Sequence, residues 1–142
     1  MRLLSCLILV GVMTAGCGDD GNGGTPTAPS ANVAYSTTDL RVGTGAEATS
    51  GRNVSVRYTG WLYSTSSPDN KGQVFDSGTY SFVAGSNQAI EGFSRAVVGM
   101  RVGGVRRVVI PPNLGYGNNP PAGSIIRANE TLLFEIELLS VQ

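Results

Sequence analysis

The apolar residues of this chain recur mainly at every second position, which is the side-chain period of a β-strand. Residues 54–58 alternate apolar and polar side chains and continue toward Tyr63, and residues 132–138 repeat this pattern over a longer run. Residues 105–110 form a third run, which ends at two prolines that cannot donate hydrogen bonds to a sheet. Shorter candidates are residues 40–42 and 80–83. The period predicts several strands and limits the chain to folds built on a sheet.

Only one segment has the period of a helix. In residues 88–98, apolar side chains stand at Ile90 and at the third, sixth and seventh positions after it, and Gly99 follows as a stop signal. One short helix beside several strands, without alternation of strands and helices, predicts an antiparallel α+β domain. The chain has 142 residues, 41% of them hydrophobic, which is enough for one domain with its own core.

The N-terminal part of the chain has the composition of an export signal. Residues 1–16 carry one basic residue, an apolar run too short to span a bilayer, and a group of small residues. The residues around Cys17 resemble the lipobox of bacterial lipoproteins, so we expect a lipidated Cys17 at the mature N-terminus. The alternative is an ordinary cleaved signal with an incidental cysteine. Residues 17–32 contain no large apolar side chain beyond that cysteine and predict a flexible tether, which leaves residues 33–142 as the folded domain.

The charge and residue inventory excludes several classes of function. Ten basic and ten acidic residues give a net charge of zero, which argues against nucleic-acid binding. The sequence contains no histidine, the commonest general base and the commonest metal ligand. Its acidic residues are scattered, so we expect no metal site and no cofactor. Any catalysis would have to proceed without imidazole chemistry.

A series of short motifs covers most of residues 38–141. They are VRYTGWL (56–62), VFDS (74–77), FVAG (82–85) with AIEGF (89–93), GMRVGG (99–104), IPP (110–112) with LGYG (114–117), and TLLFEIELL (131–139). With these motifs in this order, the chain resembles the FKBP-type peptidyl-prolyl cis-trans isomerases.

This resemblance implies a half-barrel, in which a curved antiparallel sheet of about five strands wraps around one short helix. Between them lies a hydrophobic pocket for a proline ring. It implies a catalytic group in which the Asp76 carboxylate is bound to the Tyr58 hydroxyl, while the Ile90 N–H and the Tyr116 hydroxyl bond carbonyls of the peptide. Phe93 takes the floor position, where many members have Trp. The implied substrate-binding residues are Tyr58, Phe75, Asp76, Tyr80, Phe82, Ala89, Ile90, Phe93, Tyr116, Ile125, Ile126 and Phe134.

The implied function is acceleration of X–Pro bond rotation, without a cofactor, in proline-containing peptides and unfolded exported proteins. The implied location is the bacterial cell envelope, where a lipid anchor would hold the protein on the periplasmic side of the inner or outer membrane. We expect a monomer. Macrolide inhibitors are a further class of ligand, and the sequence leaves open whether they bind. The alternative function is a module that binds proline-containing segments as a chaperone or scaffold with little isomerase activity.

The sequence departs from the family pattern in its loops. Residues 126–129 read IRAN where many members have Ile-Pro-Pro-Asn, and loss of both prolines should make this loop more flexible. Residues 64–71 form a longer polar hairpin tip, and residues 117–123 contain two consecutive prolines. We expect these differences to change which peptides fit and to leave the activity in place.

Overall fold

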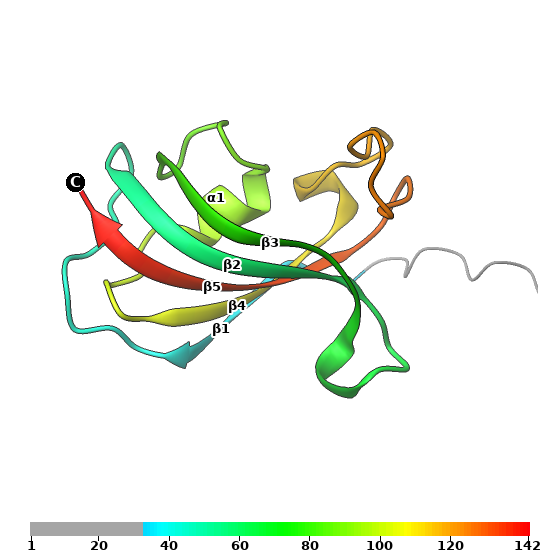
Figure 1. Cartoon of the computed structure of the whole chain (residues 1–142), viewed down its shortest axis with the longest axis horizontal. Helices are drawn as coiled ribbons and strands as arrows, with labels where there is room; N and C mark the ends of the chain where they lie inside the picture. The colour runs from blue at the N-terminus through cyan, green and yellow to red at the C-terminus, as the bar shows by residue number, and fades with distance from the viewer. Residues whose placement is uncertain (1–32) are drawn as a thin grey trace, which may run out of the picture.

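A five-stranded antiparallel sheet with one helix over it forms the part of the chain that the computed structural model describes, residues 33–142 (Figure 1). The strands lie in the order β1-β4-β5-β2-β3, and every neighbouring pair is antiparallel. The sheet curves, and α1 lies over one of its faces. This confirms the predicted α+β fold and its curved sheet. The elements are β1 (Ser36–Arg41), β2 (Asn53–Tyr63), β3 (Lys71–Val83), α1 (Glu91–Val97), β4 (Val105–Ile110) and β5 (Leu132–Val141), with short 3-10 turns at Pro68–Asn70 and Pro112–Leu114.

The central strand β5 shows why the alternating pattern of the sequence produces this sheet. It pairs with β4 on one side and β2 on the other, so its backbone is bonded along both edges. Leu132, Phe134, Ile136 and Leu138 point into the core beneath α1, and each is at most 4% exposed. The residues between them point to the opposite face, because successive side chains of a strand alternate. We call the side that carries α1 the inner face and the other side the outer face.

The helix is shorter than its sequence pattern predicts. It begins at Glu91, whereas the pattern extends from residue 88, because Ile90 has an extended backbone with φ −56° and ψ 147°. At the other end, Arg106 of β4 donates to the carbonyls of Ala96 and Val98 at 2.8 and 3.3 Å and so satisfies groups that the last helical turn leaves free. The helix lies so close to β4 that a Cβ on Gly92 would come within 2.6 Å of Ile110 Cγ2.

Two strands differ in extent from the prediction, and both lie at the edges of the sheet. The predicted strand at residues 40–42 is β1, Ser36–Arg41, and Val42 lies beyond it with 73% of its surface exposed. The predicted strand at residues 80–83 is only the end of β3, Lys71–Val83. Most residues of both strands are exposed on both faces. An edge strand of this kind needs no apolar alternation, so the pattern found only its most apolar part.

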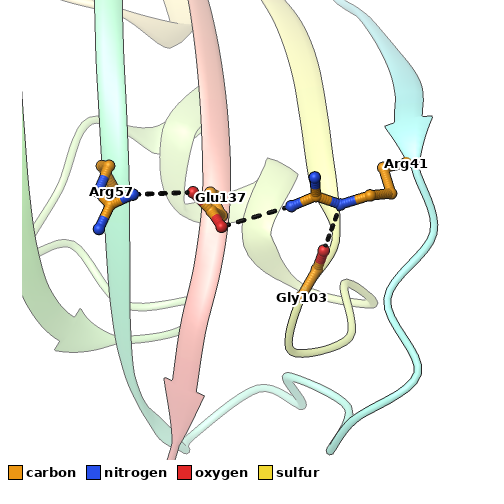
Figure 2. A network of polar contacts seen from close by, with 4 residues as sticks. All are labelled: Arg41, Arg57, Gly103 and Glu137. Carbon is orange, nitrogen blue, oxygen red and sulfur yellow. Dashed lines mark hydrogen bonds and ion pairs between the residues drawn. The ribbon is translucent and has the colours of Figure 1, made fainter.

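The outer face is covered by ion pairs that cross several strands. Glu137 on β5 lies between Arg57 on β2 and Arg41 on β1, with N–O distances of 3.4 Å to each, and Arg41 also donates to the carbonyl of Gly103 at 2.8 Å (Figure 2). The pair of Arg41 with Glu137 joins β1 and β5, which are not neighbours in the sheet, whereas Arg57 and Glu137 lie on the neighbouring strands β2 and β5.

A second outer-face cluster surrounds Glu135, the next outward residue of β5. Its carboxylate contacts Lys71 of β3 at 2.8 Å and Arg107 of β4 at 2.9 Å, and the Lys71 ammonium lies 4.6 Å from the centre of the Trp61 ring. Each outward carboxylate of β5 therefore has a cation on both sides.

The predictions for the N-terminal part fall on residues 1–32, which lie outside the described residues. This applies to the signal peptide at residues 1–16, the lipidated Cys17 and the tether at residues 17–32. Within residues 33–142, no helix is long and apolar enough to cross a membrane.

Candidate active site

A pocket of about 470 Å³ opens on the inner face between the sheet and the segment that leads into α1. Tyr58 comes from β2, Phe134 from β5, and Phe93 from α1, so three elements hold its base. The remaining walls come from β3, from the segment before α1 and from the segment after β4. The lining residues are Tyr58, Phe75, Asp76, Tyr80, Asn87, Gln88, Ala89, Ile90, Phe93, Tyr116 and Phe134.

Aromatic rings packed edge to face form the base of this pocket. Phe93 meets Phe134 with ring centres 5.1 Å apart and planes 81° apart, and it meets Tyr58 at 5.6 Å and 85°. Phe75 also packs on Phe134, with ring centres 5.3 Å apart and planes 89° apart. The edge-to-face arrangement is favourable because the positive edge of one ring faces the negative face of the next. It leaves an apolar slot of the kind that suits a small aliphatic ring.

Asp76 lies at the edge of this slot, and both of its carboxylate oxygens are bonded. The Tyr58 hydroxyl donates to Oδ2 at 2.7 Å, and the backbone N–H of Ser77 donates to Oδ1 at 2.9 Å. Burial, followed by the hydrogen bond to Asp76 and its charge, raises the pKa of Tyr58 to about 12. Tyr58 therefore keeps its proton at neutral pH and holds the carboxylate in one orientation.

Two of the pocket's donors without a partner within residues 33–142 are the ones that the family resemblance assigns to a bound peptide. They are the backbone N–H of Ile90 and the hydroxyl of Tyr116. Burial, and then the negative charge of Asp76, raises the pKa of the Tyr116 hydroxyl, so this group also stays protonated at neutral pH. The site thus offers an apolar slot with several hydrogen-bond donors available to a bound molecule, these two among them.

The pocket has little capacity for proton transfer or metal binding. Asp76 is the one charged side chain among its lining residues. Within residues 33–142, no three His, Cys, Asp or Glu residues are grouped so as to hold a metal ion. The lining thus combines aromatic rings and hydrogen-bond donors with a single carboxylate.

Comparison with known families gives a match over residues 45–139 to the FKBP-type peptidyl-prolyl cis-trans isomerases. The chain belongs to this family. Among its FKBP-type relatives is FK506-binding protein 3 of Candida albicans, 44% identical over 110 residues, which are 75% of this chain and 24% of the relative. The FK506-binding protein of Neisseria meningitidis serogroup B is 39% identical over 108 residues, which cover 72% of this chain and 92% of the relative.

The solved structures agree with this assignment. The crystal structure of a peptidyl-prolyl cis-trans isomerase from Pseudomonas syringae has a TM-score of 0.63 and 33% sequence identity to the chain, and the match covers 76% of this chain and 75% of that one. This chain spans only about a quarter of the length of the Candida protein, so the likeness to that relative concerns the FKBP-type domain alone.

The FKBP-type pocket gathers most of the residues predicted for it, with three exceptions. Phe82 is 2% exposed and lies behind the lining, where it packs on Tyr80 and Phe93 with ring centres 5.3 and 5.7 Å away. Ile126 is 6% exposed and belongs to the core, whereas Ile125 is 40% exposed, and neither lines the pocket.

Sequence reasoning missed two lining residues, Asn87 and Gln88. Both precede the helix start at Glu91, and the pattern that predicted a helix from residue 88 hid the loop character of this segment. The polar run Ser86, Asn87, Gln88 after Gly85 was the one available signal, because such runs favour loops.

Proposed function

We propose that this FKBP-type chain accelerates cis–trans rotation about X–Pro bonds in exported proteins, with the proline ring bound in the aromatic slot. The observation that carries this proposal is the combination of that slot with the Tyr58–Asp76 pair and with the two free donors of Ile90 and Tyr116. The proposed roles of these four residues, and of the other lining residues as the substrate-binding surface, rest on that geometry.

The proposed mechanism lowers the rotation barrier without a covalent intermediate. Rotation about the peptide bond costs roughly 18–20 kcal/mol, because resonance gives the C–N bond partial double-bond character. The planar, charge-separated amide is the form that water solvates best, so an apolar aromatic slot that excludes water stabilises it less. Donors that hold the flanking carbonyls in a turn favour the twisted amide, and such differential binding is what accelerates a reaction.

Asp76 acts in this proposal by fixing the Tyr58 ring and the edge of the slot. Its two hydrogen bonds come from Tyr58 and the Ser77 backbone, so it orients one wall of the site without exchanging a proton. A hydrogen bond to a charged group contributes roughly 1.5–3 kcal/mol. We therefore expect Asp76→Ala to lower kcat/KM by about 10- to 100-fold while the protein stays folded.

The test follows relaxation of a peptide with one Leu-Pro bond, using wild type, Asp76→Ala and Tyr63→Phe. Tyr63 lies at the end of β2 and does not line the pocket, so Tyr63→Phe should match wild type. Circular dichroism establishes folding first. A folded wild type that leaves the uncatalysed rate unchanged contradicts the isomerase proposal and favours a module that only binds proline-containing segments.

The ligand class of the pocket follows from the same proposal. Several relatives are named FK506-binding proteins, and the aromatic slot is apolar enough for the ring systems of a macrolide. We propose that FK506 binds in this slot and competes with the proline peptide. Inhibition of isomerisation by FK506 that disappears in Phe75→Ala would support this placement.

We further propose that the protein works as a monomer on the periplasmic side of a bacterial membrane, anchored through a lipid on Cys17. The sequence of residues 1–17 supports the anchor and the location. Mass spectrometry and fractionation of cells that express wild type or Cys17→Ala provide the test. A mature wild-type chain without an acyl group, or a Cys17→Ala chain that stays in the membrane fraction, contradicts the anchor.

A further inference from the structure

The loop of residues 84–90, which joins β3 to α1, decides the shape of one whole side of the pocket. Its last four residues, 87–90, all line the cavity. Ile90 at its end carries the backbone N–H that the proposed function assigns to a carbonyl of the bound peptide. A displacement of this loop would therefore move a hydrogen-bond donor and a wall of the slot together.

The backbone holds the start of this loop, where Ala84 pairs with Gly51 and Arg52 at 2.9 Å each, but it holds residues 86–90 weakly. The Ser86 N–H donates to the Val83 carbonyl at 3.1 Å, which closes the turn at the end of β3. Beyond that turn, the N–H groups of Asn87, Ala89 and Ile90 have no hydrogen-bond acceptor within residues 33–142. Loops with few backbone hydrogen bonds are the parts of a protein that open most readily.

Side-chain hydrogen bonds supply the missing restraint, and Gln88 is at their centre. The Tyr80 hydroxyl donates to the Gln88 carbonyl at 2.8 Å, and the Gln88 side-chain oxygen accepts from the Val83 N–H, also at 2.8 Å. The Gln88 N–H donates to the Ser86 hydroxyl oxygen at 3.3 Å, and that hydroxyl donates to the Val83 carbonyl at 2.6 Å. Gln88 is thus tied to β3 through its N–H, its carbonyl and its side chain.

The Tyr80 ring is itself held in place. It stacks on Phe82 with ring centres 5.3 Å apart and planes 15° apart. Phe82 is 2% exposed, and its ring centre lies 5.7 Å from that of Phe93 at the pocket base. The hydroxyl that bonds the loop is therefore presented by a ring fixed against the core.

We infer that Tyr80 and Gln88 are positioning residues that hold the 84–90 loop in its peptide-binding shape and so set the affinity for the substrate. The inference rests on the proposed function, because it concerns the peptide that this function assigns to the pocket. These hydrogen bonds join groups of the protein to each other, and they are the same before and during bond rotation. Their loss makes the peptide-binding loop shape less populated in the free protein, whereas the bound peptide restores that shape in the ground state and the transition state alike. KM is therefore raised and kcat is unchanged.

The experiment uses the full chain and two substitutions that change single groups. Tyr80→Phe removes the hydroxyl and keeps the stacked ring, and Gln88→Met removes the side-chain acceptor at similar volume. One net hydrogen bond corresponds to a loss of affinity between about 2-fold and about 10-fold. We expect this increase in both the KM and the Kd of the Leu-Pro peptide, with kcat unchanged. Gln88→Glu, which keeps an oxygen for the Val83 N–H, should restore wild-type affinity, and Tyr63→Phe is the matched control.

Amide hydrogen exchange reports the loop directly. The Val83 N–H should exchange faster in Gln88→Met and at the wild-type rate in Gln88→Glu, because only the former removes its acceptor. Peptide binding is measured separately from turnover, so a wild type that binds but does not accelerate rotation overturns the proposed function and leaves this inference standing. Unchanged Kd in both variants overturns the inference. Tighter binding by Tyr80→Phe also overturns it, because the hydroxyl would then be competing with the peptide for the Gln88 carbonyl.

Discussion

The inner and outer faces of the sheet are built from the same strands but hold together by different forces. On β5, Phe134 points inward into a set of edge-to-face rings, and its neighbour Glu135 points outward to Lys71 and Arg107. The inner face has one charged side chain at its pocket, whereas the outer face carries ion pairs across several strands. One strand thus supplies an aromatic binding surface and a charged surface at alternate residues.

This contrast between the two faces predicts how substitutions on each face should affect stability and activity. Inner-face rings contribute both to the core and to the slot, so their removal should cost stability and activity together. Outer-face ion pairs do not line the main pocket, so their removal should cost stability alone. Their contributions should also be smaller, because solvent screens charges that are partly exposed.

The largest effect is expected for Phe134→Ala. Phe134 is 4% exposed and its ring contacts those of Tyr58, Phe75 and Phe93, so truncation removes apolar contacts and leaves a cavity. Changes of this kind lower the free energy of unfolding by roughly 3–5 kcal/mol. Urea denaturation measures this loss, and the isomerisation assay should show no remaining turnover. Phe134→Leu, which fills more of the space, should lose less stability, and equal losses for the two variants would contradict the cavity argument.

Glu135→Gln should have the largest effect on the outer face. Its carboxylate is the shared partner of Lys71 and Arg107, whose side chains are only 29% and 25% exposed. Removing the charge leaves two partly buried cations unpaired, and we expect a loss of roughly 1–2 kcal/mol, below the value for a fully buried pair. The value of kcat/KM should match wild type. A loss of activity without a loss of stability would break the separation between the two faces.

The dependence of stability on acidic pH also tests Glu135. Burial acts to raise the pKa of Glu135, but the hydrogen bonds and charges of Lys71 and Arg107 outweigh it and hold the pKa below the ordinary value of 4.5. The stabilisation is therefore present above about pH 4.5 and is lost as the pH falls through the lowered pKa. Urea denaturation between neutral pH and pH 3 should show a steeper fall for wild type than for Glu135→Gln.

The sequence predicted the inner face far better than the outer one. Alternation placed Phe134 and Ile136 inward, and the family resemblance placed Tyr58 and Asp76 together, because both signals depend on residue type at fixed spacing. The pairing of Arg57 with Glu137 depends on the register of β2 against β5, which no local pattern contains. Gln88 was missed for the same reason. The hydrogen bond that its side chain accepts from the Val83 N–H depends on how the loop lies against β3, and no local pattern contains this arrangement.

The dependence of stability on alkaline pH should show a smaller contribution from Tyr58, a residue of the inner face. Because the pKa of Tyr58 is raised to about 12, the unfolded chain releases this proton above about pH 10 while the folded protein keeps it. The folded state then binds more protons, so stability should fall as the pH rises from about 10 toward 12. The stability of Tyr58→Phe should fall less steeply over this range, because this variant lacks the hydroxyl whose pKa differs between the folded and unfolded states. Equal slopes for the two proteins in urea denaturation would contradict the raised pKa of Tyr58, which burial and then the Asp76 hydrogen bond produce.

The smallest loss of stability is expected for Glu137→Gln. This substitution tests whether solvent exposure limits the contribution of an outer-face ion pair to stability. Glu137 shares Arg41 and Arg57 as Glu135 shares its cations, but these arginines are 59% and 66% exposed and both distances are 3.4 Å. Arg41 also keeps the Gly103 carbonyl as a partner after the substitution. We therefore expect a loss below about 1 kcal/mol that shrinks further in high salt. A loss equal to that of Glu135→Gln would show that linking β1, β5 and β2 matters more for this sheet than the burial of the charges that link them.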